Sequence, residues 1–273
     1  MLNYSAEVWG NHPGADIERI HTKFCRKVLQ VKTSTNLDCL YGELGRLPMS
    51  VMRKIIMIRY WIKIITSSHT SLLYRVYSML MTDVENNDTY NGTNWAHQIK
   101  CILDNIGMSN IWINQAGSNI IFTNIKLRII EIYKQTWYSN INNSPRLETY
   151  SLFKHDFTIE PYIDFIKEKK YRIALTQLRL SSHQLEIERG RYTNIERNDR
   201  KCKQCDMNLV ENEFHFILVC PKFRTIRNKY LKRYYCQWPT INKLQNLFME
   251  KSKRVVTNLS KYIYFATKAR LDV

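Results

Sequence analysis

The sequence predicts a mainly α-helical protein, built as an irregular multi-helix bundle. Apolar residues recur at spacings of three and four along most of the 273 residues, which is the period of amphipathic helices. The chain contains only eight Gly and six Pro, which argues against a turn-dense β protein. Hydrophobic residues make up 44% of the chain, so it can form a packed core and is not a disordered protein.

Three helices are expected before residue 82. The first has Asp16 as its N-cap, the second ends near Ser67, and the third covers residues 70–81; a turn-rich segment at residues 40–48 separates the first two. The residues expected to face inward are Ile17, Ile20, Phe24 and Val28, then Ile55, Ile58, Ile62 and Ile65, then Leu73, Tyr77 and Leu80.

The middle of the chain contains a predicted loop and two further helices. Residues 83–93 are polar and have no apolar period, so they are expected to form a surface loop. Asn94 then caps a short helix that ends at Gly107, and a longer helix covers residues 119–138. The Asn-rich segment 140–144 is the expected boundary between helical domains of residues 1–144 and 145–273, and Pro145 fits the first turn of the next element.

The second domain is expected to contain two long helices. One covers residues 161–190, with a possible break near Ser181 and Gly190 at its C-terminal end, and the other covers residues 254–270. Their inward-facing residues are expected to be Tyr171, Ala174, Leu178, Ser182 and Leu185, then Val255, Leu259, Tyr262, Ile263 and Ala266.

Four potential metal ligands lie between these two helices. Cys202, Cys205, His215 and Cys220 form the pattern C-x2-C-x9-H-x4-C. A Cys-x-x-Cys turn directs two thiolates at one ion, and a helix over residues 211–219 would present the imidazole. Pro221 would end that helix and let Cys220 turn back toward the others. The spacing therefore predicts a small Cys3His module, about residues 200–238, that holds one structural Zn²⁺ ion with a closed coordination sphere.

The chain is strongly basic, with a formal net charge of +17. Such a surplus favours a polyanionic partner, here the phosphate backbone of RNA or DNA. The expected phosphate contacts are Lys201, Lys203, Lys222, Arg224, Arg227, Lys229 and Arg233. On the helix expected after Pro221, a stripe of Phe223, Ile226, Tyr230 and Tyr234 is consistent either with a core face or with a surface on which unpaired bases stack.

The sequence indicates neither a membrane nor a secreted protein. The most apolar stretch, residues 53–65, is interrupted by Lys54, Arg59 and Lys63, and no basic segment followed by an apolar block stands at the N-terminus. Seven Cys is an odd number and suits a reducing compartment better than a disulfide framework. We therefore expect an intracellular protein, in the nucleus or the cytoplasm.

Two blocks of the sequence resemble the C-terminal region of non-LTR (LINE-type) retrotransposon reverse transcriptases. The first comprises YSAEVWG, IERIHTKFCRKVL and LYGELGRLPM, and is similar to the helical region that follows the polymerase core. The second runs from RLSSHQLEIERGRY through RKCKQC to NEFHFILVCPKF, and is similar to the Cys/His segment known there as the zinc-binding region. The resemblance implies a helical region that helps to engage template RNA or target DNA.

The polymerase chemistry of that family is not expected here. It needs two adjacent aspartates to hold two Mg²⁺ ions, and no Asp-Asp pair occurs in the sequence. The first block also begins close to Met1, so the chain is expected to be a truncated copy or fragment without catalysis. The alternative is a protein-interaction scaffold, in which the zinc module stiffens a helical surface and binds no nucleic acid.

Overall fold

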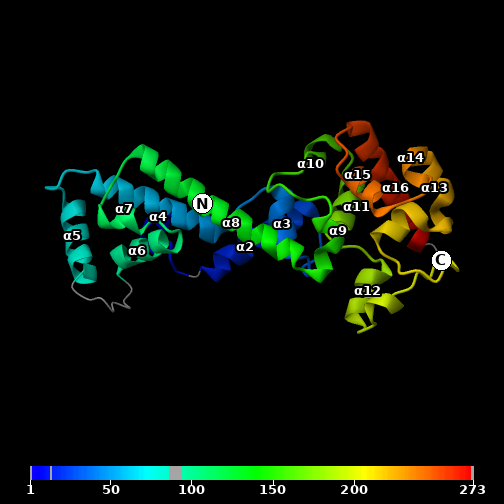
Figure 1. Cartoon of the computed structure of the whole chain (residues 1–273), viewed down its shortest axis with the longest axis horizontal. Helices are drawn as coiled ribbons and strands as arrows, with labels where there is room; N and C mark the ends of the chain where they lie inside the picture. The colour runs from blue at the N-terminus through cyan, green and yellow to red at the C-terminus, as the bar shows by residue number, and fades with distance from the viewer. Residues whose placement is uncertain (1, 13, 86–93, 272–273) are drawn as a thin grey trace. The chain divides into compact units, whose positions relative to one another are not determined.

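The computed structural model describes residues 2–12, 14–85 and 94–271 (Figure 1). Within these ranges the protein is mainly helical, as predicted, and contains no β-sheet, only two isolated bridges. The chain folds as two compact units. Unit 1 comprises Met1–His21 and Leu47–Trp137, and unit 2 comprises Thr22–Arg46 and Tyr138–Val273.

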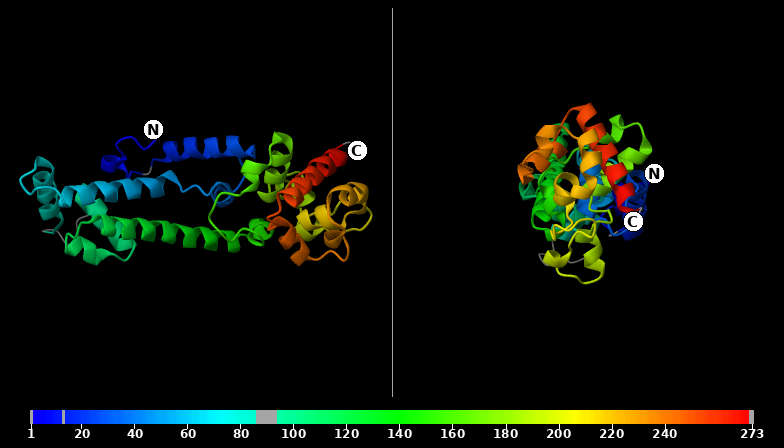
Figure 2. Two further views of the ribbon diagram at one scale, coloured as in Figure 1. Left: turned by 90° about the horizontal axis from the view of Figure 1, so that it is seen from above. Right: turned by 90° about the vertical axis from the view of Figure 1, so that its right-hand side faces the viewer.

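Unit 1 is a set of helices around one apolar core (Figures 1 and 2). Trp61 is fully buried there, and its ring stacks on that of Trp112 with 6.2 Å between the centroids. The Trp61 indole donates a hydrogen bond to the Tyr77 hydroxyl over 2.9 Å. The helices are α1 (Ala6–Trp9), the start of α2 (Ala15–Leu29), α4 (Met49–Ile65), α5 (Leu72–Glu85), α6 (Trp95–Asn105), α7 (Ser109–Ile113) and most of α8 (Asn119–Asn142).

Several expectations for unit 1 are confirmed. Ile55, Ile58 and Ile62 are buried on α4. The side chain of Asn94 caps α6 by accepting hydrogen bonds from two backbone N–H groups of its first turn, and Gly107 follows the helix with a φ of 73°. Helix α5 continues through Glu85, and residues 86–93 of the predicted loop lie outside the described residues. Leu73 is 49% exposed, contrary to the expectation.

The predicted inner face of α2 is wrong. Ile20, Phe24 and Val28 are each about half exposed, whereas the neighbouring face, about 100° around the helix, carries the buried residues His21, Cys25 and Leu29. Asp16 is not the N-cap but lies in the first turn of α2. Apolar periodicity alone misses a polar contact of this helix, which Glu18 makes.

Helix α2 is oriented by the capping of another helix. The carboxylate of Glu18 accepts hydrogen bonds from the backbone N–H groups of Met49 and Ser50, at 3.3 and 3.2 Å. These are the first two residues of α4, whose own N-cap, Pro48, offers no side-chain acceptor. Since an unsatisfied helix N-terminus is costly and favours a negative charge, this contact holds the Glu18 side of α2 against the first turn of α4.

Unit 2 is built around the packing of α11 (Lys169–Arg179) and α13 (Arg224–Tyr230) against α16 (Lys253–Leu271). Val255, Leu259, Tyr262, Ile263 and Ala266 are all buried on α16, as predicted. The other helices are α3 (Leu37–Leu44), α9 (Glu148–Ser151), α10 (Tyr162–Phe165), α12 (Glu186–Tyr192), α14 (Arg233–Cys236) and α15 (Ile241–Phe248). Shorter turns are η1 (Pro145–Leu147), η2 (Arg197–Asp199), η3 (His215–Val219) and η4 (Pro221–Phe223).

Three expectations for unit 2 need correction. Residues 40–44, expected to be turn-rich, belong to α3, which begins after the side-chain cap of Asn36 and ends at Gly45 in the left-handed conformation. The helix expected over residues 161–190 is three helices, α10, α11 and α12. The break expected near Ser181 is present, with a φ of 50° at that residue, and the break between α10 and α11 is unexpected. Gly190 is not a C-cap but a buried residue inside α12, where it packs against the side chain of Arg200.

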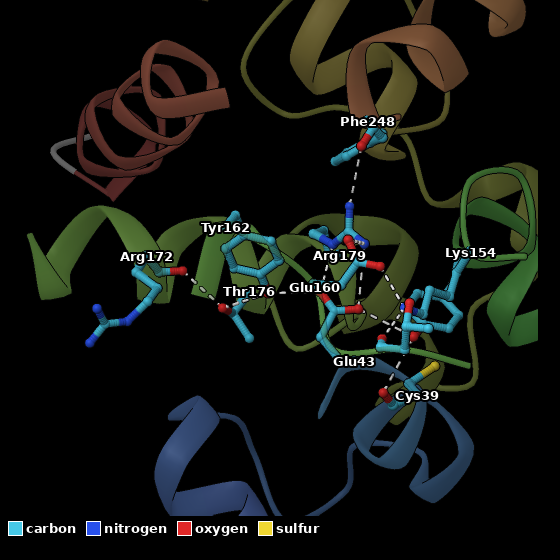
Figure 3. A network of polar contacts seen from close by, with 11 residues as sticks. Cys39, Glu43, Lys154, Glu160, Tyr162, Arg172, Thr176, Arg179 and Phe248 are labelled. Carbon is cyan, nitrogen blue, oxygen red and sulfur yellow. Dashed lines mark hydrogen bonds and ion pairs between the residues drawn. The ribbon is translucent and has the colours of Figure 1, made fainter. Parts of the chain in front are cut away.

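A buried polar network joins the elements of unit 2 (Figure 3). Glu43 on α3 accepts hydrogen bonds from Arg179 Nε at 2.6 Å and from the Tyr162 hydroxyl at 2.7 Å. Arg179 also pairs with Glu160 at 2.8 Å, and Glu160 pairs with Lys154. Two acids and two bases balance one another, so the network ties α3, α10 and α11 together without an unpaired buried charge.

Candidate metal centre and the basic groove beside it

Cys202, Cys205, His215 and Cys220 gather at one place in unit 2, as their spacing predicts. One ligand atom from each residue lies within 4.8 Å of those of the other three. His215, Cys202 and Cys220 are buried, and Cys205 is half-buried. The four side chains could therefore hold one metal ion.

A short hairpin positions the first two ligands. Its arms are joined by an antiparallel bridge between Lys201 and Val210, and the Cys202 N–H donates to the Leu209 carbonyl over 2.9 Å. At the tip, the backbone N–H of Gln204 donates to the Cys202 sulfur at 3.4 Å. A hydrogen bond from a backbone N–H stabilises the thiolate form, which is the form that binds a metal.

The other two ligands are joined by a π-helical turn, η3. The N–H of Cys220 donates to the carbonyl of His215, five residues earlier, over 2.7 Å. In an α-helix, side chains five residues apart differ by about 140° around the axis, whereas the wider π turn brings the fifth residue back toward the first. Cys220 then leaves the helix with a ψ of 122° before Pro221, which confirms the predicted break.

The π turn leaves the Phe216 carbonyl without its usual helical partner. That partner would be the N–H of Cys220, which already donates to His215. The hydroxyl of Tyr262 on α16 donates to the Phe216 carbonyl instead, over 2.6 Å. A buried carbonyl of the metal-binding turn is thereby satisfied by the C-terminal helix.

Arg227, expected to contact phosphate, has a structural role in the same turn. The Ile217 carbonyl would bond to the residue four positions later, but this is Pro221, which has no N–H. Arg227 Nε donates to that carbonyl at 2.7 Å, and its Nη2 donates to the Cys220 carbonyl at 2.7 Å. The side chain is buried, so the prediction that it lies on an outward basic face is wrong.

The geometry and chemistry of the four residues fit a soft or borderline metal ion. In a tetrahedral site with bonds of about 2.0–2.3 Å, neighbouring ligand atoms are about 3.5–3.8 Å apart. His215 Nε2 lies 3.5 Å from the Cys205 sulfur, which matches an edge of such a tetrahedron. Three sulfurs and one imidazole suit such an ion and do not suit calcium or magnesium, which prefer oxygen ligands.

Burial shifts the protonation equilibria of the ligands in the metal-free protein. It raises the pKa of the Cys202 and Cys220 thiols, and it lowers the pKa of the His215 imidazole. The shift at His215 favours the neutral ring, which is the form that binds a metal. A bound dication would reverse the shift at the thiols, because it stabilises thiolates directly.

A buried ion cluster connects the hairpin to α16. Arg270 donates to both carboxylate oxygens of Glu211, at 2.8 and 2.7 Å, and also lies 3.3 Å from Glu186. The hydrogen bonds with Glu211 raise the pKa of Arg270. Lys203, an expected phosphate contact, pairs with Glu186 at 3.3 Å but keeps a side chain that is 67% exposed.

A groove of about 720 Å³ lies beside the π turn, and no Asp or Glu lines it. Arg224 and Arg233, two of the expected phosphate contacts, are exposed residues of its lining. Lys222 and Lys229 are exposed on η4 and α13, and Lys201 is half-buried in the hairpin. The groove is lined by Met207, Leu218, Val219, Pro221, Arg224, Arg227, Asn228, Leu231, Arg233, Cys236, Gln237 and Pro239.

The aromatic stripe expected after Pro221 is divided between core and surface. Phe223 is fully buried, whereas Tyr234, on the separate helix α14, is 59% exposed. Trp238, which the sequence analysis does not single out, is 87% exposed. The sequence signal that could have identified Trp238 is a Trp next to a Pro in a polar segment.

His183, a lone histidine in the sequence, has a buried acidic partner. Its Nε2 lies 3.0 Å from the Glu213 carboxylate. Burial alone would raise the pKa of Glu213, but the hydrogen bonds from His183 and Thr149 outweigh it and hold that pKa below its ordinary value. Glu213 begins the helical segment that contains His215, so this pair helps to hold the ligand-bearing element in place.

The chain matches no protein-family model, no curated protein and no solved structure. Within the part of the chain that the structure describes, no helix is both long enough and apolar enough to cross a bilayer.

Proposed function

We propose that this chain binds nucleic acid through the groove beside a zinc centre, and that it derives from the C-terminal region of a non-LTR retrotransposon reverse transcriptase. The observation that carries the proposal is the groove itself, which contains three arginines and no carboxylate. A concave surface with one sign of charge concentrates counter-ions of the other sign, and a polynucleotide is such a counter-ion.

Zinc is the ion that best suits the centre. Three thiolates and one imidazole are a common ligand set for structural zinc, and the four ligand atoms lie within 4.8 Å of one another. Four protein ligands leave no open position for a reacting water. The ion would hold the hairpin against the π turn, whose residues Leu218 and Val219 line the groove. Its role in this proposal is to keep the binding surface in shape.

Arg224 and Arg233 are the proposed phosphate contacts inside the groove. Both are exposed, and a guanidinium can bind a phosphate with two parallel hydrogen bonds. Among the described residues, the guanidinium of Arg233 donates to the neutral side-chain amide oxygen of Gln237, at 3.1 and 3.2 Å, and forms no ion pair. Its positive charge is therefore not neutralised there. Lys222 and Lys229 extend the positive surface.

The proposal contains no catalytic step. The resembled enzymes transfer nucleotides with an adjacent aspartate pair, and this sequence has no such pair. The resemblance of RKCKQC and NEFHFILVCPKF to the zinc-binding region supports the retroelement origin. On this proposal, the chain keeps a binding region of that protein and lacks its polymerase site.

Binding to labelled RNA and DNA over a range of salt concentrations tests the proposal. We expect the logarithm of the association constant to fall linearly with the logarithm of the salt concentration. The double variant Arg224→Gln/Arg233→Gln should bind more weakly and reduce the slope by about 2, one for each lost phosphate contact. The matched control Lys63→Gln/Arg75→Gln removes the same charge from exposed residues of α4 and α5.

Two results would contradict the proposal. Absence of binding at low salt would favour the scaffold, in which the metal centre stiffens a protein-binding surface. An equal loss of affinity for nucleic acid in the groove variant and in the control variant would show that net charge, and not the groove, attracts the polyanion. Elemental analysis of the purified protein would test the zinc assignment, with one ion expected for each chain.

A further inference from the structure

Two exposed aromatic rings belong to the segment 233–239, which contributes Arg233, Cys236, Gln237 and Pro239 to the lining of the basic groove. Trp238 is 87% exposed and Tyr234 is 59% exposed, whereas Trp61, Trp112 and Trp137 are at most 5% exposed. Exposing a ring as large as indole to water forfeits the free energy that its burial would provide. An exposed Trp therefore suggests that a partner covers it.

The backbone at Trp238 is also in an unfavourable conformation. Its φ is 48°, in the left-handed region that Gly occupies readily and bulky residues rarely adopt. The ring gains little packing within the chain that would compensate for this strain, since most of its surface faces solvent. Such strain recurs at ligand-binding positions, where the geometry of one side chain matters more than stability.

Both rings are next in the sequence to residues that line the groove. The two neighbours of Trp238 in the sequence, Gln237 and Pro239, both line it. Tyr234 follows Arg233 directly, and Lys243 Nζ lies 4.9 Å from the centre of the Tyr234 ring. Positive charge for a phosphate backbone and aromatic faces for bases are therefore carried by the same short segment of the chain, residues 233–239.

We propose that the groove binds single-stranded nucleic acid, with phosphates at Arg224 and Arg233 and an unpaired base stacked on Trp238. This inference rests on the proposed function and narrows it to one class of ligand. A duplex keeps its bases stacked on one another and would leave the exposed rings unused, whereas every unpaired base has a face that can stack on an aromatic side chain. Tyr234 provides a second stacking surface for a neighbouring base.

The test compares pyrimidine oligonucleotides with duplexes of the same length, as RNA and as DNA, on the full metal-loaded chain. Trp238→Gly removes the ring and suits the left-handed backbone, so a loss of binding would not reflect a loss of folding. We expect it to weaken single-strand binding roughly fivefold to a hundredfold and to leave duplex binding unchanged. Trp238→Phe should keep most of the affinity, because its ring can still stack.

A second readout comes from tryptophan fluorescence. Oligonucleotide binding should quench the wild-type signal more than the Trp238→Phe signal, and the difference reports on the indole that a base covers. Tyr4→Ala is the control for the loss of an exposed ring, since Tyr4 is 81% exposed in unit 1; its binding should equal that of the wild type.

The possible outcomes separate this inference from the proposal on which it rests. If Trp238→Gly binds single strands as tightly as the wild type while Arg224→Gln/Arg233→Gln does not, the groove binds nucleic acid and the stacking inference is wrong. Tighter binding of duplexes than of single strands would overturn it as well. No binding by the wild type at low salt would overturn both proposals.

Discussion

Tyr262 acts on the metal centre through one hydrogen bond. Its hydroxyl donates to the Phe216 carbonyl over 2.6 Å, because the π turn has used the N–H that would otherwise bond there. We predict that Tyr262→Phe destabilises the metal-loaded protein by about 1–3 kcal/mol, since it leaves a buried carbonyl without a partner. Urea denaturation followed by circular dichroism measures the difference.

Tyr264→Phe provides the comparison for this prediction. Tyr264 lies two residues along the same helix, is half-buried, and packs against Tyr171 with its ring. Its substitution should change the free energy of unfolding by less than about 0.5 kcal/mol. Equal effects of the two substitutions would mean that the ring of Tyr262, and not its hydroxyl, contributes the stability.

Single residues show where sequence reasoning succeeds and where it fails. The grouping of the four candidate metal ligands could be predicted because their chemistry and spacing are local. Arg227 could not be placed, because its burial depends on the carbonyl of Ile217, ten residues earlier. That carbonyl has no backbone donor, since Pro221 lacks an N–H. His183 could not be paired in advance with Glu213, since the two lie 30 residues apart in the sequence.

At the scale of elements, the π turn η3 sets the distance between the last two ligands. Pro221 supports this turn, because a residue before proline is disfavoured in the helical conformation and Cys220 is therefore kept outside the helix. We predict that Pro221→Ala weakens metal binding about tenfold, the lower end of effects from residues that support metal ligands. Competition with a metal-binding dye measures the affinity.

Pro145→Ala is the matched control, because Pro145 also begins a short helical turn, η1. It should leave the affinity for metal unchanged. Unchanged affinity in both variants would show that the neighbouring hydrogen bonds hold the π turn without the proline.

The limits of helices with a strong apolar period could be predicted from the sequence. The buried faces and the breaks of other helices could not. Helices α4, α6 and α16 follow their expected limits closely, since each has a buried apolar stripe, and α6 also has the local cap Asn94. The inner face of α2 could not be predicted, because Glu18 caps a helix that begins 31 residues later. The breaks between α10, α11 and α12 interrupt an apolar pattern that continues through them.

At the scale of the whole molecule, metal removal should act on one unit. Structural zinc in small modules contributes apparent binding energies of about 10–16 kcal/mol, and this energy stabilises the fold around the ion. We predict that a chelator raises amide hydrogen exchange in residues 200–236 and in α16, which Tyr262 and Arg270 join to the metal centre. Exchange in α4 and α6 of unit 1 should not change.

Hydrogen exchange followed by mass spectrometry on the full chain gives this comparison. Readdition of zinc should restore the slow exchange, which separates metal loss from irreversible unfolding. Faster exchange throughout both units, or in neither, would contradict a metal effect confined to unit 2.

The fold class could be predicted from the sequence, and the grouping of its elements could not. Composition and period indicate a helical protein, and the structure confirms it. Unit 2, however, combines residues 22–46 with residues 138–273, so its core forms between segments that lie far apart in the chain. The buried network of Glu43 with Arg179, 136 residues later, is of this long-range kind and leaves no local signal.

The groove without carboxylates has a practical consequence for anyone who isolates this protein. Cellular polynucleotides are abundant, and a concave cationic surface with exposed rings is expected to retain them through lysis and chromatography. The ultraviolet absorbance of a fresh preparation should therefore show a nucleotide contribution, which a wash in concentrated salt removes.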